Sequence, residues 1–450
     1  MATLTQKGKP LRLTTPLGPD VLLLERMVMD EGVSRPFSLQ LELLSLNTSI
    51  DTKDILRKQV TVEIDLADGS TRYVNGVVRR FSQHERDKGL VTYRAEVVPS
   101  IWLLSLSSDC RVFQNMTTTE IVKKVFDEAG FKDYKVNVTG AQGTREYCVQ
   151  YRESHLDFVS RLLEEEGIFY FFEHTSKANT IVLADAPSAI KPAMVARMSM
   201  TVAMSAETGE DTIDELEIGS VVTSAKVTLL DYNDQTTKKI STSIAGTATA
   251  YGLAKSEVFD YPGEFAVVGD GERIARVRMD ELEAQTHSIR GRTLSRGLAS
   301  GQKLTVADHY RTDVNGAYHL LTLHHEGTVG DYVSGGGEAF SYSATFMGIP
   351  ALVPFRPARV TPKSIVHGTQ TAVVVGPSGE EIYVDKYGRV KVQFFWDREG
   401  TMDDKSSCWV RVSNAWAGKQ WGFIQIPRIG QEVIVDFLEG DPDRPIITGR

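Results

Sequence analysis

Apolar and polar residues alternate with a period of two along most of this chain, and that period is typical of β-strands with one buried face. In the first hundred residues the alternating segments are 61–66, 74–78 and 91–97. Gly69 and Gly89 lie between them, where a chain that reverses direction needs turn residues. Because a closed antiparallel sheet leaves no exposed edge, we expect residues 1–100 to form a β-barrel.

Two segments within residues 101–200 follow the helical period instead. Thr117 and Glu120 have the spacing of a capping box, and an apolar helical stripe follows them. A second helix is expected to begin near Ser154 and to end at Gly167. These signals predict a helix-containing domain inserted between barrels.

Residues 201–353 return to strand patterns, as at 221–230 and 318–323. One helix is expected to interrupt them, from Glu272 to about Thr286. This part of the chain therefore predicts a second β-barrel.

Two segments read as connections. The glycine-rich run 334–337 is expected to be a mobile loop rather than a cradle for phosphate. Residues 354–370 are expected to be a linker, because three prolines between Pro354 and Pro362 stiffen it into a semi-rigid spacer.

The last part of the chain, 371–450, is expected to be a small five-stranded barrel of the oligonucleotide/oligosaccharide-binding (OB) type. Gly388 and Gly430 stand where strands must reverse direction. Four apolar residues share one face of the strand after Gly388: Val390, Val392, Phe394 and Trp396. The whole pattern predicts a mainly β (α+β) protein in which a few helices lie between barrels.

Five sequence segments carry a resemblance to a known family. They read YRESHLDFVSRLLEEEGIFYFFEH, GRVKVQFFWD, SCWVRVS, IPRIGQEVIVDF and EGDPDRPIITGR. The chain resembles the VgrG family, the spike proteins of type VI secretion systems, which look like a fusion of the hub and the spike base of a contractile phage tail. The order of strands and helices between the matched segments is similar too.

The resemblance implies a homotrimer in which two related barrels per chain form a pseudo-sixfold hub on a hexameric Hcp-type tube. Sheath contraction would drive this spike transiently through a target membrane. Other implied partners are baseplate components, a PAAR-type tip protein, and toxin effectors with their chaperones. The family's C-terminal β-helical needle is expected to be absent, because the sequence stops at Gly449 and Arg450.

Three alternatives remain at this point. The first is the hub and spike of a contractile phage tail or of an extracellular injection particle. The second is a cell-wall hydrolase with an added lysozyme-type domain. Such a domain would be a helical insertion between Pro362 and Thr371, and this segment is too short to contain one. The third is a carbohydrate- or nucleic-acid-binding barrel, by analogy with the fold alone.

Charge and cysteine content narrow the class further. A net charge of −9 argues against nucleic acid as a partner. Cys110, Cys148 and Cys408 lack paired spacing, so folding in a reducing compartment without disulfides is expected. No run approaches the ~18 apolar residues of a membrane span. The N-terminus has no apolar signal region, so we expect assembly in the cytoplasm and later export without a signal peptide.

Several acidic, histidine and cysteine residues are candidates for chemistry. Consecutive acids on a helix point apart, so Glu164, Glu165 and Glu166 are expected to form a solvated helix end rather than a glycosidase pair. Asp403 and Asp404 are likewise expected to be solvated. His324 and His325 should face opposite sides of a strand, and so cannot share a metal ion. The other histidines lack ligand spacing: His84, His155, His174, His287, His309, His319 and His367.

Cys408 is expected to be a barrel core residue rather than a nucleophile. The segment from Gly269 to Gly271 is expected to be a helix cap rather than an anion site. No catalytic, cofactor-binding or metal-binding residue is therefore predicted, and the protein is expected not to be an enzyme.

Stability of the last barrel is expected to depend on buried aromatic residues such as Trp409, Trp416 and Trp421. Exposed ion pairs contribute only ~0–1 kcal/mol each, so they are expected to matter less. The sequence predicts inter-chain pairs between one set of bases and acids: Arg389, Lys391, Arg411 and Arg428 with Glu432, Asp436 and Glu439.

Overall fold

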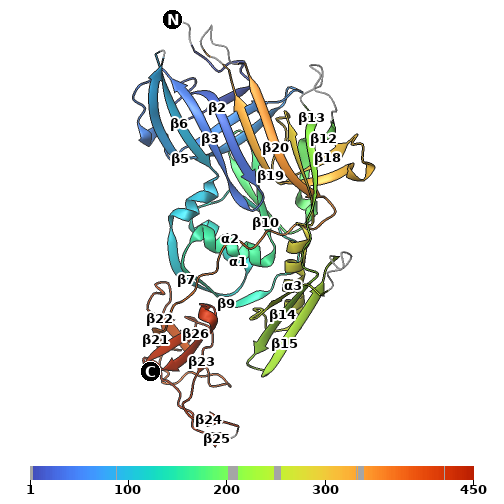
Figure 1. Cartoon of the computed structure of the whole chain (residues 1–450). Coiled ribbons are helices and arrows are strands. Elements are labelled where there is room, and N and C mark those ends of the chain that lie inside the picture. Colours follow the sequence, from blue (N-terminus) through green and yellow to red (C-terminus); the bar gives the residue numbers. More distant parts are fainter. Residues whose placement is uncertain are drawn as a thin grey trace.

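The computed structural model describes residues 4–87, 89–200, 211–247, 255–330, 332, 339–419 and 421–450. Two β-barrels lie at one end of the molecule, helices α1 and α2 lie in the middle, and two smaller β-units lie at the other end (Figure 1). The glycine-rich run 334–337, expected to be a loop, falls outside the described residues.

The first barrel uses six of the described strands in the order β1-β4-β5-β6-β3-β2. Their bounds are β1 Leu11–Thr14, β2 Leu23–Gly32, β3 Arg35–Ser45, β4 Gln59–Asp65, β5 Thr71–Asp87 and β6 Leu90–Val98. Alternation decides which face is buried: on β3, Phe37, Leu39, Leu41 and Leu43 are each at most 1% exposed. The strand segments predicted from 61 to 97 are all present.

A single side chain spans the gap between β1 and β2, which no described backbone ladder joins. The Gln6 amide nitrogen donates to the carbonyls of Leu13 (3.1 Å) and Leu22 (3.3 Å). Its amide oxygen accepts from the backbone amides of Leu13 (2.9 Å) and Leu24 (3.1 Å). One buried glutamine thus replaces a stretch of strand pairing and satisfies the edge groups of this barrel.

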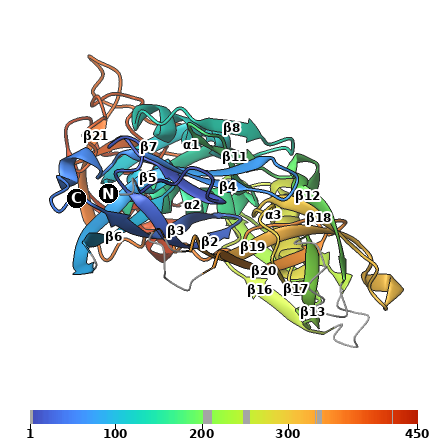
Figure 2. The ribbon, with the colours of Figure 1, turned by 90° about the horizontal axis from the view of Figure 1, so that it is seen from above.

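The second barrel is a closed ring of described strands in the order β19-β18-β12-β13-β17-β20, with β20 pairing back onto β19. Their bounds are β12 Lys191–Met200, β13 Thr212–Ser220, β17 His287–Thr293, β18 Gln302–Ala307, β19 Gly316–Thr328 and β20 Ser341–Pro350. Strand β19 also pairs with β2 of the first barrel. The barrels therefore share one continuous sheet and lie side by side (Figure 2).

A separate small unit interrupts the barrel expected over 201–353. Strands β14 (Lys226–Asn233), β15 (Lys238–Ala245) and β16 (Glu257–Asp260) pair only with one another in the described sheets, and helix α3 (Val268–Glu283) covers them. Its own core explains the separation: Val227, Leu229, Phe265, Ala275 and Met279 pack together. Alternation reveals a strand but not the sheet that the strand joins.

The inserted region contains helices α1 (Thr118–Glu128) and α2 (His155–Glu166). Its strands are β7 Ser108–Thr117, β8 Tyr134–Asn137, β9 Thr144–Ser154, β10 Phe169–His174 and β11 Asn179–Ala184. The predicted capping box is confirmed, since the Thr117 amide donates to the Glu120 carboxylate at 2.7 Å. Gly167 ends α2 with φ of 68°, as predicted.

The C-terminal unit is the predicted five-stranded barrel in the described part of 371–450. Its strands are β21 Gln370–Val375, β22 Lys391–Phe394, β23 Arg411–Val412, β26 Glu432–Phe437 and β27 Pro445–Gly449. They run in the order β22-β21-β26-β27-β23, and a bridge between Val390 and Val410 closes the ring. Val390, Val392 and Phe394 are almost fully buried, as their shared face predicted.

The expectation about tryptophan burial is wrong for two of the three residues in this chain. Trp409 is half-buried, but Trp416 and Trp421 are 63% and 61% exposed. Both belong to a two-stranded hairpin, β24 (Ala417–Gly418) and β25 (Trp421–Gly422), which projects away from the barrel (Figure 1). An apolar side chain in a strand pattern need not be buried within its own chain, and these two indoles face solvent.

The bases expected to pair between chains already have partners within the chain. Arg389 pairs with Asp385 at 2.8 Å, Arg411 with Asp234 at 3.7 Å, and Arg428 with Glu381. The ammonium of Lys391 lies 5.3 Å from the Trp409 ring centre.

Candidate functional site

The three consecutive glutamates at the end of α2 mark a junction between four parts of the molecule. The Glu164 carboxylate accepts hydrogen bonds from the backbone amides of Val360 (3.0 Å) and Thr361 (2.9 Å) and from the Thr361 hydroxyl (2.8 Å). It thereby holds the proline-rich linker against the insert. The expectation of a solvated helix end is wrong here, because Glu164 is buried.

The next two glutamates point toward other neighbours. Glu165 pairs with Arg145 (2.8 Å) and Arg161 (3.4 Å). Burial opposes ionisation of Glu165, but these two guanidinium groups outweigh it and lower its pKa to about 2. Glu166 pairs with Arg145 and with Arg273 on α3. Consecutive helical residues do point apart, as expected, and each therefore contacts a different segment.

Lys363 of the linker lies at the centre of the junction. Its ammonium is 3.3 Å from Glu264 of the α3 unit, and 2.9 Å from both Asp441 and Asp443 of the C-terminal barrel. Burial disfavours the charged amine, but the three carboxylates raise the pKa of Lys363 well above its ordinary value. Burial in turn raises the pKa of Asp441 and Glu264. One cation thus bridges linker, α3 unit and barrel.

Two arginines complete the network. Arg444 of the barrel lies 2.8 Å from Asp231, which is 1% exposed on β14. Arg356 of the linker donates to the carbonyls of Gly167 (3.1 Å) and Asp185 (2.8 Å) and lies 3.4 Å from Asp280 on α3. Buried pairs of this kind hold segments in one geometry more than they add net stability.

A second buried charge cluster joins the two hub barrels. Glu31 on β2 lies 2.8 Å from both Arg72 on β5 and His325 on β19. The Ser300 hydroxyl donates to Glu31 at 3.1 Å, and the Tyr342 hydroxyl lies 3.0 Å from His325. Burial alone would raise the pKa of Glu31, but Arg72 and His325 outweigh it and lower that pKa to about 2.

The prediction that His324 and His325 face opposite sides is confirmed. His325 is fully buried, whereas His324 lies on the outer face, 2.8 Å from Asp30. Burial lowers the pKa of His325, and hydrogen bonding to Asp30 raises that of His324.

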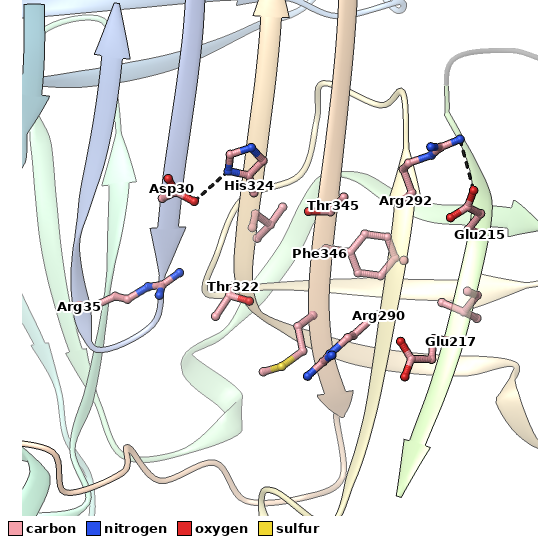
Figure 3. A pocket seen from close by; sticks show the side chains of 14 residues that line it. Asp30, Arg35, Glu215, Glu217, Arg290, Arg292, Thr322, His324, Thr345 and Phe346 are labelled. Carbon is pink, nitrogen blue, oxygen red and sulfur yellow. Dashed lines mark hydrogen bonds and ion pairs between the residues drawn. The ribbon is translucent and has the colours of Figure 1, made fainter.

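An open groove of about 630 Å³ crosses the outer face of β2, β19, β20, β17 and β13 beside His324 (Figure 3). Thr322 and Thr345 lie between its charged side chains, which include the pairs His324–Asp30 at 2.8 Å and Arg292–Glu215 at 3.4 Å. Three acids (Asp30, Glu215 and Glu217) and three arginines (Arg35, Arg290 and Arg292) line the groove, so no single charge dominates it. The groove therefore fits a polar contact surface better than a site that concentrates one charge on a small ligand.

The remaining candidates take structural positions. Asp403 accepts hydrogen bonds within its own turn, from Thr401 and Lys405. Cys408 packs against the core of the C-terminal barrel, as expected, and burial raises its pKa to about 12. All three cysteines are free.

The segment from Gly269 to Gly271 lies inside the first turn of α3 and is not its cap. The N-cap residue, Val267, makes no side-chain capping hydrogen bond. A side chain at Gly271 would meet the Phe265 ring at 2.7 Å, so this glycine permits close packing of helix and loop.

Two absences hold for the described ranges. No group of three or more His, Cys, Asp or Glu side chains there is placed to hold a metal ion. No helix in that same part of the chain is long and apolar enough to cross a membrane.

Sequence reasoning did not find the residues of the junction or of the hub cluster. Lys363, Asp231, Glu31 and Arg72 are isolated charges far apart in the chain, and no spacing rule connects them. The one available signal is the segment EGDPDRP, which contains Asp441, Asp443 and Arg444 and was noticed only through the resemblance.

Comparison with known proteins agrees with this architecture. The sequence model of the phage tail baseplate hub family (GPD) matches residues 30–331. That of the type VI secretion system and phage-baseplate injector OB domain matches 378–450. The fold thus defines a class: a baseplate hub joined to an injector barrel in one chain.

Curated relatives make the assignment more specific. The chain is 42% identical to the type VI secretion system spike protein VgrG1a of Pseudomonas aeruginosa, over 99% of this chain and 70% of that protein. It is 41% identical to VgrG1b of the same organism, over 99% of this chain and 61% of that protein. The chain belongs to the VgrG family of type VI secretion spike proteins, and spans about two thirds of these relatives' lengths.

A further relative and the solved structures are consistent with this. The actin cross-linking toxin VgrG1 of Vibrio cholerae is 35% identical over 92% of this chain, which covers 38% of that toxin. A type VI secretion component of E. coli, the c3393 protein, superposes with a TM-score of 0.70 at 21% sequence identity. The match covers 97% of this chain and 99% of that one, and that protein is described as structurally similar to the T4 phage tail proteins gp27 and gp5. A chain of a PdpA–VgrG complex superposes with a TM-score of 0.59 at 10% sequence identity, over 95% of this chain and 82% of that one.

Proposed function

We propose that this chain is the structural hub and spike base of a type VI secretion system. Three copies would assemble about one axis, and their six hub barrels would seat on a hexameric Hcp-type tube. The observation that supports this best is the shared strand β19, which joins two six-stranded barrels of one chain into a single sheet. Such a pair is the unit needed to match threefold with sixfold symmetry.

The proposed action is mechanical rather than catalytic. Axial force applied to the hub would reach the C-terminal barrel through the ionic junction around Lys363 and Glu164. The barrels suit such a load, since the second hub barrel closes on itself and the Gln6 side chain bridges the β1–β2 seam of the first, which leaves little free edge to peel apart. The proposed divisions are 1–100 for the first hub barrel, 101–200 for the insert, 201–353 for the second hub barrel, 354–370 for the linker and 371–450 for the spike base. Strand β12 of the second barrel lies before residue 201, and β14–β16 with α3 form a separate unit within 201–353.

The proposed partners follow from the family. They are the tube, baseplate components, and a PAAR-type tip and effectors with their chaperones, which would attach beyond the C-terminal barrel. The chain would assemble in the cytoplasm and then be driven out through a target membrane, with no nucleic acid involved.

Light scattering on the purified protein tests the assembly. Three chains per particle are expected, with pseudo-sixfold symmetry at the hub in electron micrographs viewed along the axis. A lone chain at all concentrations, or an even-numbered ring, would contradict the proposal. A peptidoglycan turbidity assay should stay flat, and clearing would instead favour a cell-wall hydrolase.

A further inference from the structure

The β24–β25 hairpin, with its described flanking residues (413–419 and 421–427), forms an exposed aromatic arm. Four large apolar side chains along it are strongly exposed: Trp416 at 63%, Trp421 at 61%, Phe423 at 46% and Ile424 at 78%. A contiguous apolar surface that a single chain leaves exposed usually marks a site where another molecule binds. Residues 413–427 contain one charged residue, Lys419.

The arm has a defined geometry. Phe423 donates its backbone amide to the Trp416 carbonyl at 3.0 Å, and the two tryptophan rings meet edge to face at 6.3 Å. A side chain at Gly418 would lie 2.2 Å from the Trp421 indole, so this glycine lets the indole lie flat on the opposite strand. These contacts favour one arrangement of the aromatic surface, which a covering partner would hold in place.

The flanks of the arm are held by the barrel, where the Ser413 amide donates to the Ile447 carbonyl at 2.9 Å and Ile426 packs against the barrel core, but the hairpin itself projects away from it (Figure 1). Its two strands pair only with each other among the described strands, and an isolated two-stranded hairpin is marginally stable in water. The same barrel exposes a second apolar surface, the 382–387 loop, in which Ile382, Val384 and Tyr387 are 44%, 38% and 47% exposed. This loop begins beside the base of the arm, where the Ile429 amide donates to the Glu381 carbonyl at 3.1 Å.

We propose that the arm of one chain lies across the 382–387 loop of a neighbouring copy of the same chain, burying Trp416 and Trp421 between chains. This inference rests on the proposed homotrimer and specifies its contact at the spike base. A contact between two different surfaces of one chain is heterologous, and it closes into a ring when three copies turn about one axis.

The available area supports a second copy as the occupant. An aromatic side chain buries ~150–250 Å² when covered, so at the observed exposures the arm can remove on the order of 500 Å² from water. With an equal area on the receiving loop, each contact buries roughly 1,000 Å², which is where specific protein interfaces begin. A membrane-binding arm would instead need a cluster of basic residues, and this one has a single lysine.

The double variant W416S/W421S tests the arm in the full chain. Both rings are exposed in the single chain, so its circular dichroism should not change. The concentration at which the particle dissociates, measured by light scattering, should rise at least tenfold. The matched control is Y310S/L352S, which removes two apolar side chains exposed at 88% and 96% elsewhere, and should leave dissociation unchanged.

Disulfide trapping tests the geometry. Chains carrying only Ala417→Cys, co-assembled with chains carrying only Tyr387→Cys, should form a linked dimer under oxidation. Neither single variant should give this dimer alone.

The outcomes separate the two proposals. A lone wild-type chain at all concentrations contradicts the trimer itself. A wild-type trimer whose dissociation is unaffected by W416S/W421S contradicts the arm alone. Tryptophan-dependent sedimentation with phosphatidylcholine–phosphatidylserine vesicles would also overturn it, because the arm would then face lipid.

Discussion

The hub and the C-terminal barrel are attached to the rest of the molecule by different kinds of bond. The two hub barrels share strand β19, so backbone hydrogen bonds run without a break from one to the other. The C-terminal barrel shares no described strand with the hub and is positioned by side-chain charges around Lys363 and Arg444. A shared ladder cannot separate without unfolding a strand, whereas an ionic junction can open while both sides stay folded.

The largest loss of unfolding free energy is expected from a substitution in the buried charge cluster of the hub. Arg72→Met leaves the Glu31 carboxylate buried without its guanidinium partner, and removal of one partner from such a pair costs about 3–5 kcal/mol. Urea unfolding of the hub would measure the loss. The control is Arg94→Met on the same barrel, because Arg94 is 56% exposed and its pair with Glu42 is worth ~0–1 kcal/mol. Equal losses would contradict burial as the cause.

Lys363→Met tests the other side of the comparison. It leaves Asp441, Asp443 and Glu264 facing one another, and since Lys363 is 21% exposed we expect a cost of about 2–4 kcal/mol, somewhat below that of a fully buried pair. The loss should appear in the calorimetric transition of the C-terminal barrel while the hub transition stays in place. Lys405→Met, at an exposed lysine of the same barrel that lies outside both the junction and the 382–387 loop, is the control. A uniform shift of both transitions would mean that the junction is not a separate unit.

As the pH falls, the protein should lose folding stability through protonation of a buried histidine before its paired carboxylates become protonated. Burial lowers the pKa of His174 to about 4, although Glu31 acts in the opposite direction. The unfolded chain takes up this proton near pH ~6.5 and the folded chain only near 4, so stability present at neutral pH is lost as pH falls through this window. His174 alone should contribute about 2 kcal/mol between pH 7 and pH 5.

Urea unfolding at the two pH values measures this contribution. Glu31, whose pKa is about 2, loses its contribution only below its ordinary value of 4.5. His174→Gln should therefore reduce the pH dependence between pH 7 and 5 by about 2 kcal/mol, while His325, whose pKa burial also lowers, keeps its own contribution. An unchanged slope would contradict the assignment.

The smallest loss of stability is expected for substitutions at exposed residues of the C-terminal barrel and its arm, measured in the dissociated chain. Sequence reasoning predicts that Trp421→Ala destabilises the barrel more than Arg411→Ala. With Trp421 61% exposed and Arg411 37% exposed in its 3.7 Å pair, we now expect each to cost only ~0–1 kcal/mol in the single chain. Thermal unfolding of diluted protein compares them. A large loss for Trp421 alone would mean that its indole packs on its own barrel.

The same contrast explains which features of the site could be predicted. The face of Val390, Val392 and Phe394, the cap formed by Thr117 and Glu120, and the opposite orientation of His324 and His325 all depend on neighbours within a few residues. The three glutamates at 164–166 were misread, because their partners lie on segments as distant as Arg273 and Thr361.

By itself the sequence determined the local elements: strands from alternation, two helices from their capping signals, and the identity of the family from contiguous motifs. Only the tertiary structure decided which sheet each strand joined, that β19 serves two barrels, that Gln6 closes a seam, and that Lys363 bridges three units. The physical reason is distance. Local patterns record energies between near neighbours in the chain, whereas buried charges, shared strands and an uncovered aromatic arm depend on segments brought together only by folding.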